Sequence, residues 1–202
     1  MSSMTKIKPI LYCDARPLIR DGDPILWRID RRQWTKPSNL LIARIGGSDY
    51  VHAGMAAWRG GELNLVHTRQ WRGGCEVPLE KVVRGWPGQW DVFRPHQPYD
   101  TEKAVAEMLK VVGRKYGWQN LIVSALRHTW ITSGFLPPLT DDSLNGSAPF
   151  CSQAVSRACR AGGRDPRPHA ADIATEPGHL ADPAFAEYLC TLYWNRLPEV
   201  TA

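Results

Sequence analysis

The residue of this chain best suited to nucleophilic chemistry is a cysteine at the expected start of a helix. Cys151 stands in PFCSQAVSRACRAGG, residues 149–163, directly after Pro149 and Phe150. Because proline fits poorly inside a helix, we expect the helix to begin at or beside Cys151 and to run to about Gly162. A thiol there faces unpaired backbone N–H groups and the positive end of the helix dipole, and both favour the thiolate. The alternative is a small apolar residue buried in the core.

Two histidines are expected to lie on one hairpin. His52 stands in SDYVHAGMAAW and His67 in ELNLVHTRQW, with the pair Gly60 and Gly61 between them. Strands joined by such a turn lie side by side, so the two imidazoles are predicted to be neighbours on one face. His52 could then accept the proton of Cys151 while His67 orients His52 and fixes its tautomer. The alternative for His67 is a hydrogen bond to a backbone carbonyl.

The remaining histidines and cysteines give weaker signals. His169 and His179 follow proline-rich loops and are expected to be solvated. Four further cysteines are expected to be small apolar residues, with Cys159 facing the core and Cys75 in a loop after two glycines: Cys13, Cys75, Cys159 and Cys190. The cysteine count is odd, no CxxC occurs and no Cys/His set has zinc spacing, so we expect no disulfide framework and no metal site.

Length and charge limit the class of protein. The 202 residues suit one domain, with a core over about residues 20–190. A net charge of +5 favours polyanions but names none of them. Nucleic acid is not expected, because no nucleic-acid-binding signature accompanies the charge, whereas cell-wall polymers and anionic lipid surfaces would both suit it. The apolar run near the N-terminus is too short for a signal peptide, and Arg127 and His128 interrupt the most apolar stretch, residues 120–139. We therefore expect a chain made in the cytoplasm without a transmembrane segment, exported, if at all, by a non-classical or phage-associated route.

The spacing of apolar residues along the chain changes from that typical of strands to that typical of helices, and these elements must position the candidate residues. Turn residues and alternation predict strands first, and helical spacing follows later. The expected strands are residues 25–29, 49–58, 60–70 and 90–95; the expected helices are residues 38–45, 100–113, 118–130, 151–162 and about 183–194. Strands followed by helices favour an α+β fold with an antiparallel sheet.

Several stretches resemble a known family when taken in order: DGDPILWR, SDYVHAGMAAW, NLVHTRQ, KYGW and FCSQAV. Together they are similar to the circularly permuted branch of the NlpC/P60 papain-like cysteine hydrolases (the YiiX- and YebB-like group), which is related to the lecithin-retinol-acyltransferase-like proteins. The resemblance implies a papain-like fold with the nucleophile late in the chain. It matches Cys151 to the nucleophile, His52 to the base and His67 to the third polar residue, and makes Gly22 and Asp23 structural.

The resemblance departs from the common pattern at the third position, where many permuted members have an acid and the acyltransferase-like members a histidine. It implies acyl transfer to Cys151 without a cofactor or metal, first on amide bonds of peptidoglycan stem peptides. Lipid esters or acyl chains are the second substrate class, and a binding protein on an inactive scaffold is the third reading. We expect Tyr116, Ser152 and Trp71 to contact the substrate, the last as part of a groove partly walled by tryptophans.

Overall fold

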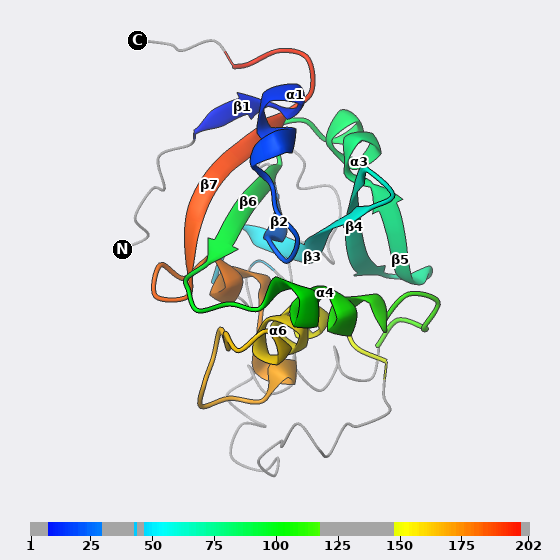
Figure 1. Cartoon of the computed structure of the whole chain (residues 1–202), viewed down its shortest axis with the longest axis vertical. Coiled ribbons are helices and arrows are strands. Elements are labelled where there is room, and N and C mark those ends of the chain that lie inside the picture. The colour runs from blue at the N-terminus through cyan, green and yellow to red at the C-terminus, as the bar shows by residue number, and fades with distance from the viewer. Residues whose placement is uncertain (1–7, 30–42, 44–46, 118–147, 199–202) are drawn as a thin grey trace.

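A seven-stranded sheet organises the computed structural model, which describes residues 8–29, 43, 47–117 and 148–198 (Figure 1). The strand order is β1-β7-β6-β2-β3-β4-β5. The strands are β1 (Pro9–Leu11), β2 (Pro24–Arg28), β3 (Tyr50–Arg59), β4 (Glu62–Arg69), β5 (Gly73–Pro78), β6 (Trp90–Pro95) and β7 (Ala186–Tyr193). Only β1 pairs in parallel, with β7; the other described pairings are antiparallel. This confirms the α+β class with an antiparallel sheet.

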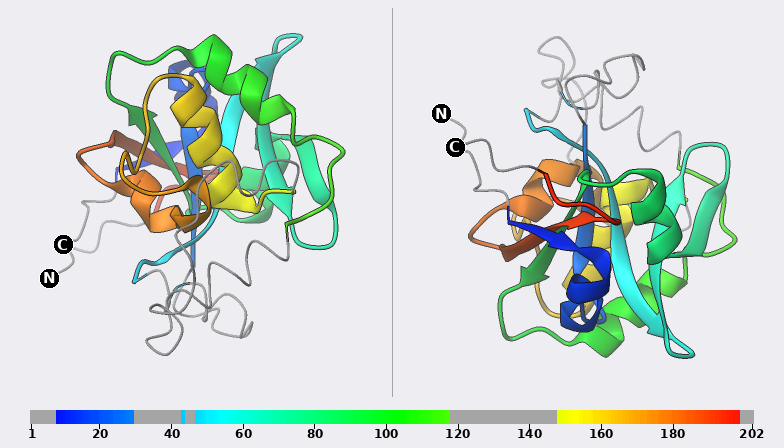
Figure 2. Two further views of the ribbon diagram at one scale, coloured as in Figure 1. Left: turned by 90° about the horizontal axis from the view of Figure 1, so that it is seen from below. Right: turned by 90° about the horizontal axis from the view of Figure 1, so that it is seen from above.

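Helices cover both faces of the sheet (Figure 2). One face carries α4 (Thr101–Leu109) and α6 (Cys151–Ala161), and the other carries α1 (Tyr12–Ala15) and α3 (Leu79–Gly85). Short 3-10 turns occupy Arg16–Leu18, Asp172–Ala174 and Pro177–Ala181. Side chains alternate along each strand, so Val66 packs with α4 and α6 while Leu65 packs with α1 and α3.

The predicted hairpin and the predicted strands around β2 and β6 are present. The helix expected over 100–113 begins as expected, because the carboxylate of Asp100 accepts a hydrogen bond from the Lys103 N–H at 3.1 Å. It ends at Leu109, earlier than expected. The chain leaves the helix because Val112 forms a parallel bridge with Gly74 of β5.

The expected helix at 183–194 is wrong, since this segment contains strand β7. Cys190 and Leu192, two residues apart, pack into the same apolar cluster, which is the spacing of one face of a strand and not of a helix. Pairing with β6 on one side and β1 on the other confirms the strand. Strand β5 and helix α3 were not predicted. The helix expected over 118–130 and almost all of that over 38–45 lie outside the described residues.

Candidate active site

The two histidines meet across strands β3 and β4, as the hairpin predicted. His67 lies opposite Gly54, and His52 is two residues away from Gly54 on the same face of β3. The Nε2 atom of His52 and the Nδ1 atom of His67 share a hydrogen bond of 2.9 Å. Gly54 makes room for this pair, because a Cβ atom there would lie 3.0 Å from the Cβ of His67 and 2.7 Å from Cδ1 of Leu65.

Burial keeps both imidazoles neutral at pH 7. It lowers the pKa of His52 to about 4, helped by the positive charge of Arg69. Burial also lowers the pKa of His67 to about 2, with smaller contributions from the charges of His52 and Arg69. In the hydrogen bond between the two rings, one nitrogen must therefore carry the hydrogen and donate its N–H to the other nitrogen. If His52 donates from Nε2, its Nδ1 lone pair is left to accept a proton, as a general base requires.

His67 is held deep in the protein. His67 as a whole is 3% exposed, and its Nε2 atom has no hydrogen-bond partner among the described residues. His52 is only partly buried, and none of the described residues hydrogen-bonds its Nδ1 atom. His52 therefore faces the accessible side of the pair, and His67 supports it from inside. With His52 on the accessible side and His67 inside, the arrangement suits a base and a residue that orients it.

Cys151 is the first residue of α6, after Phe150 in an extended conformation, as predicted. The backbone N–H groups of Ala53, Ser152 and Cys151 itself lower the pKa of the thiol, but burial outweighs them and the pKa is raised. The expectation that the helix start would favour the thiolate is therefore wrong in its net direction. The side chain is 6% exposed, and desolvation of a thiolate there exceeds the effect of the helix end.

The thiol lies against β3 at Ala53, whose N–H faces the sulfur and which follows His52 in the chain. The pairing of β3 with β4 ends at Gly54 and His67, so α6 begins where the hairpin opens. Side chains alternate here: Ala53 packs with α6, whereas the ring of His52 lies 6.3 Å from that of Trp90, which belongs to the cluster on the other face. The sulfur accepts the backbone N–H of Ala53, which points along the sheet, so the thiol lies at the open end of the hairpin while the His52 ring lies toward the face of Trp90.

A buried polar network, which the sequence analysis did not identify, fixes α6. Ser152, Ser156 and Arg160 are four residues apart and form one stripe of the helix. The hydroxyl of Ser152 donates to the Thr175 carbonyl at 2.7 Å, and that of Ser156 donates to Asp172 at 2.9 Å. Arg160 donates to the other carboxylate oxygen of Asp172 at 2.6 Å. The spacing of the three polar residues was the available signal, but it does not name Asp172 as their partner.

The three predicted substrate contacts have different positions. Tyr116 packs in the apolar cluster of Phe150, Cys151 and Ile173, so it lies near Cys151 as expected. The side chain of Ser152 is fully buried and bonded to Thr175, so it cannot contact a substrate as predicted. Trp71 is 86% exposed in the turn between β4 and β5.

The burial and position of the remaining cysteines and histidines agree only partly with expectation. Cys159 and Cys190 are buried as expected, but Cys13 is exposed, because α1 lies at the surface with its cysteine outward. Cys75 is not in a loop: it is a partly buried residue of β5, opposite His67. His169 is exposed. The remaining competitor, His179, accepts a hydrogen bond on Nδ1 from the backbone N–H three residues earlier, at 3.0 Å.

The Gly22–Asp23 pair has the structural role predicted for it. Gly22 has a φ of 81°, and a Cβ atom there would lie 3.0 Å from the ring of Tyr99. The carboxylate of Asp23 is buried and accepts hydrogen bonds from the backbone of Arg20 at 2.8 Å and from the Arg94 guanidinium at 2.7 Å. These contacts fix the turn into β2, the neighbour of β3.

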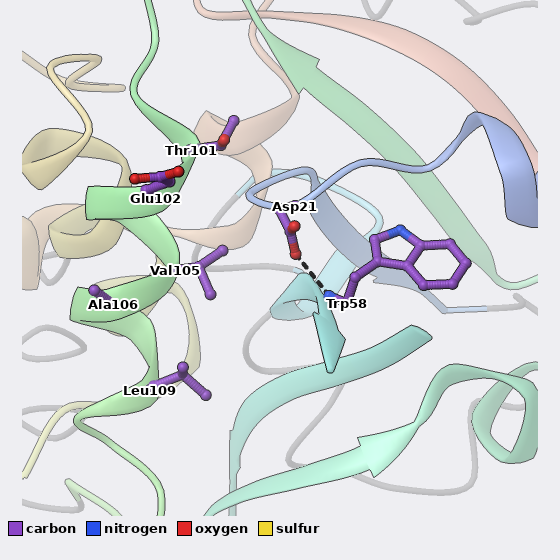
Figure 3. Close-up of a pocket in the computed structure, with 7 residues that line it drawn as sticks. All are labelled: Asp21, Trp58, Thr101, Glu102, Val105, Ala106 and Leu109. Carbon is purple, nitrogen blue, oxygen red and sulfur yellow. Dashed lines mark hydrogen bonds between the residues drawn. The ribbon is translucent and has the colours of Figure 1, made fainter. Parts of the chain in front are cut away.

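A pocket of about 280 Å³ lies at the opposite end of β3 (Figure 3). It is bounded by α4, Asp21 and Trp58, with the Asp21 carboxylate accepting a hydrogen bond from the backbone N–H of Trp58 at 2.6 Å. Trp58 is six residues from His52, which corresponds to about 20 Å along a strand. Of the predicted tryptophan-walled groove, only Trp58 lines this pocket, and the pocket is not part of the histidine pair's surroundings.

Comparison with solved structures finds the same fold in a protein described as metalloprotein yiiX from Escherichia coli O157:H7, DUF1105. The TM-score is 0.59 at 15% sequence identity, over 87% of this chain and 98% of that one. The likeness supports the YiiX-like fold of the resemblance and nothing finer; the wider NlpC/P60 relationship and the permutation stay predictions. No family model matches the chain, and neither does any curated protein.

The description of that neighbour as a metalloprotein raises the question of whether this chain could hold a metal ion. Two potential metal ligands, His52 and His67, lie side by side, but their facing nitrogens hydrogen-bond each other. Within the described ranges, no three His, Cys, Asp or Glu side chains are grouped as a metal ion requires. The described residues therefore do not fit a metal centre. The same part of the chain contains no helix long and apolar enough to cross a membrane.

Proposed function

We propose that the protein is a cysteine hydrolase that transfers an acyl group to Cys151. The observation that carries this proposal is the 2.9 Å hydrogen bond between His67 and His52, which is next in the chain to Ala53, whose N–H faces the Cys151 sulfur. A nucleophile, a base and a residue that orients the base are the parts of such a site. The YiiX-like fold is consistent with this reading.

In the proposed reaction, the Nδ1 atom of His52 takes the proton of the thiol as the sulfur attacks the acyl carbonyl. His67 accepts the Nε2–H of His52 on its own Nδ1 and so stabilises the imidazolium that forms. The backbone N–H of Cys151 at the start of α6 then donates to the oxyanion. His52 then gives the proton to the leaving amine or alcohol, which leaves a thioester on Cys151. Water, deprotonated by His52, attacks the thioester and releases the acid and the thiol.

The resting state of this site is a neutral thiol beside neutral imidazoles. The raised pKa of Cys151 and the lowered pKa values of both histidines all oppose a thiolate–imidazolium pair. Proton transfer therefore accompanies attack on the substrate, and the base must be correctly placed at that moment. This makes the reaction depend strongly on His52.

Peptidoglycan stem peptides are the first proposed substrate, on the strength of the family resemblance. Lipid esters are the second, because His67 occupies the position where acyltransferase-like members carry a histidine. To test both, the full-length protein is incubated with purified sacculi and with phospholipid vesicles, and released peptides and fatty acids are measured. Cys151→Ala should abolish release, while Cys159→Ala, which changes a buried cysteine of the same helix, should retain it if the variant folds. No release from either substrate by the wild type would contradict the proposal.

Chemical labelling of Cys151 distinguishes an enzyme from a binding protein on an inactive scaffold. Because Cys13 is exposed and Cys75 is partly exposed, the labelling uses a Cys13→Ser, Cys75→Ser background. A small peptide-like electrophile should modify Cys151 in this variant, as peptide mapping would show. An unmodified Cys151 after prolonged exposure would favour the inactive scaffold.

A further inference from the structure

Two segments distant in sequence form one edge of the molecule, which we call the basic edge. It consists of the β4–β5 turn and the chain after α4, which lie side by side (Figure 1), and comprises Arg69, Trp71, Arg72, Val112, Arg114 and Lys115. The Gly74 N–H donates to the Arg114 carbonyl at 2.8 Å, and the Gly113 N–H donates to the Gly74 carbonyl at 2.9 Å. These bonds join the two segments into a single surface.

Glycines make this close approach possible. A Cβ atom on Gly73 would lie 2.1 Å from the carbonyl oxygen of Arg114, and one on Gly74 would lie 1.8 Å from that of Val111. Any larger residue would force the segments apart. The basic edge is therefore a fixed feature of the fold rather than a chance approach of two loops.

The side chains of the basic edge combine apolar surface with positive charge. Trp71 is 86% exposed and Val112 is 42% exposed, and the four basic residues of the edge are all exposed. Within residues 69–76 and 111–116, four positive charges face one negative charge, that of Glu76, giving a net charge of +3. Trp71 also has a φ of 69°, a left-handed conformation that is uncommon for a bulky residue. The turn thus accepts backbone strain to hold an indole at the surface.

We propose that the basic edge binds the anionic surface of a phospholipid bilayer. Indole rings concentrate at the membrane interface, where the ring is apolar and its N–H stays hydrated. Arginine and lysine beside it are attracted to anionic lipid headgroups, each with an effect of about fivefold on binding. The complementary charge and the exposed tryptophan together fit such a surface. The proposal does not depend on the proposed function, because binding requires neither Cys151 nor the histidine pair.

Bound in this way, the protein would keep its candidate active site close to the membrane. Arg69 of the basic edge is near enough to act on both histidines through its charge. Arg114 is two residues before Tyr116, which packs against Cys151. A substrate held at or near the bilayer would therefore be presented to the site.

Sedimentation with vesicles tests the proposal, using the full chain with Cys151→Ala so that hydrolysis does not interfere. Binding should be at least tenfold stronger to phosphatidylcholine vesicles containing about a third phosphatidylglycerol than to pure phosphatidylcholine. The double variant Arg72→Gln, Arg114→Gln should weaken it by about 25-fold, as two charges are lost. Trp71→Ala should weaken it by about tenfold.

Matched controls come from elsewhere on the surface. Trp86→Ala removes another exposed tryptophan, at the end of α3, and Arg59→Gln another exposed arginine, at the far end of β3; each should change binding less than twofold. Equal binding to both vesicle types would overturn the proposal, as would edge variants that bind like the controls. Anionic vesicle binding that Arg72→Gln, Arg114→Gln weakens but Trp71→Ala leaves intact would also overturn it, in favour of a site for soluble polyanions.

Discussion

Gly54→Ala tests the packing that brings the two histidines together. The added methyl group would lie 2.7 Å from Cδ1 of Leu65, 3.0 Å from the Cβ of His67 and 3.0 Å from the carbonyl oxygen of Val66. The last of these is backbone on the neighbouring strand, so β4 has to move by a few tenths of an ångström. Overpacking of this kind costs about 1–3 kcal/mol. For a chain of this size that corresponds to a fall in Tm of roughly 3–10 °C.

The same movement stretches the hydrogen bond between His52 and His67 from its 2.9 Å length. We therefore expect the rate of acyl transfer to fall together with stability, by about tenfold or more, since a misplaced orienting residue weakens the base. Thermal unfolding and kcat/KM on the active substrate are measured for the variant. Gly85→Ala is the matched control: a Cβ atom there meets nothing within 4 Å, so both quantities should stay near wild type. A Gly54→Ala protein as stable and as active as that control would refute the close packing of His67 against β3.

Four further predictions concern the histidine pair, helix α6 and the basic edge. The pKa of His52 is lowered to about 4 from an unfolded value near 6.5, so the unfolded chain binds more protons between these pH values. The free energy of unfolding should therefore fall on acidification through this window, by about 3 kcal/mol from His52 alone. Urea unfolding at pH 7 and pH 4.5 measures this loss, which should be smaller in His52→Asn. The same low pKa places the acidic limb of kcat/KM near pH 4, and a limb near 6.5 would contradict it. Asp172→Ala removes the partner of Ser156 and Arg160 and should lower the free energy of unfolding in urea by about 2–3 kcal/mol. The exposed Asp49 provides the control Asp49→Ala, and equal midpoints of the two variants would contradict the network. Gly74→Ala should lose several kcal/mol or fail to fold, because its methyl group would lie 1.8 Å from a backbone oxygen, whereas soluble protein with a wild-type Tm would show that the two segments of the basic edge are not joined as described.

Local signals in the sequence were sufficient for the hairpin and for the start of α6. Alternation of apolar and polar residues on either side of Gly60 and Gly61 predicts the two strands that carry the histidines. The register of these strands then follows from the short turn between them. Pro149 fixes where α6 can begin. Each of these features depends on neighbours in the chain, which is why the positions of His52, His67 and Cys151 could be predicted.

Features that depend on distant partners could not be predicted. The apolar residues around β7 led to the prediction of a helix, whereas pairing with β6 on one side and β1 on the other makes this segment a strand. The net pKa direction of Cys151 depends on how completely other elements bury it, which the helix start alone does not show. Asp172 lies in a loop-like stretch, and its role becomes visible only when Ser156 and Arg160 of α6 are placed against it.

Acylation of Cys151 by a small activated ester tests the central claim most directly. The protein, in the Cys13→Ser, Cys75→Ser background, is mixed with p-nitrophenyl acetate at pH 7, quenched in acid at intervals and mapped by mass spectrometry. We predict an acetyl thioester on Cys151 that forms at least a hundredfold more slowly in His52→Ala, the range expected for loss of a general base. An acetyl group that never forms on Cys151, or one that forms equally fast without His52, would contradict the account.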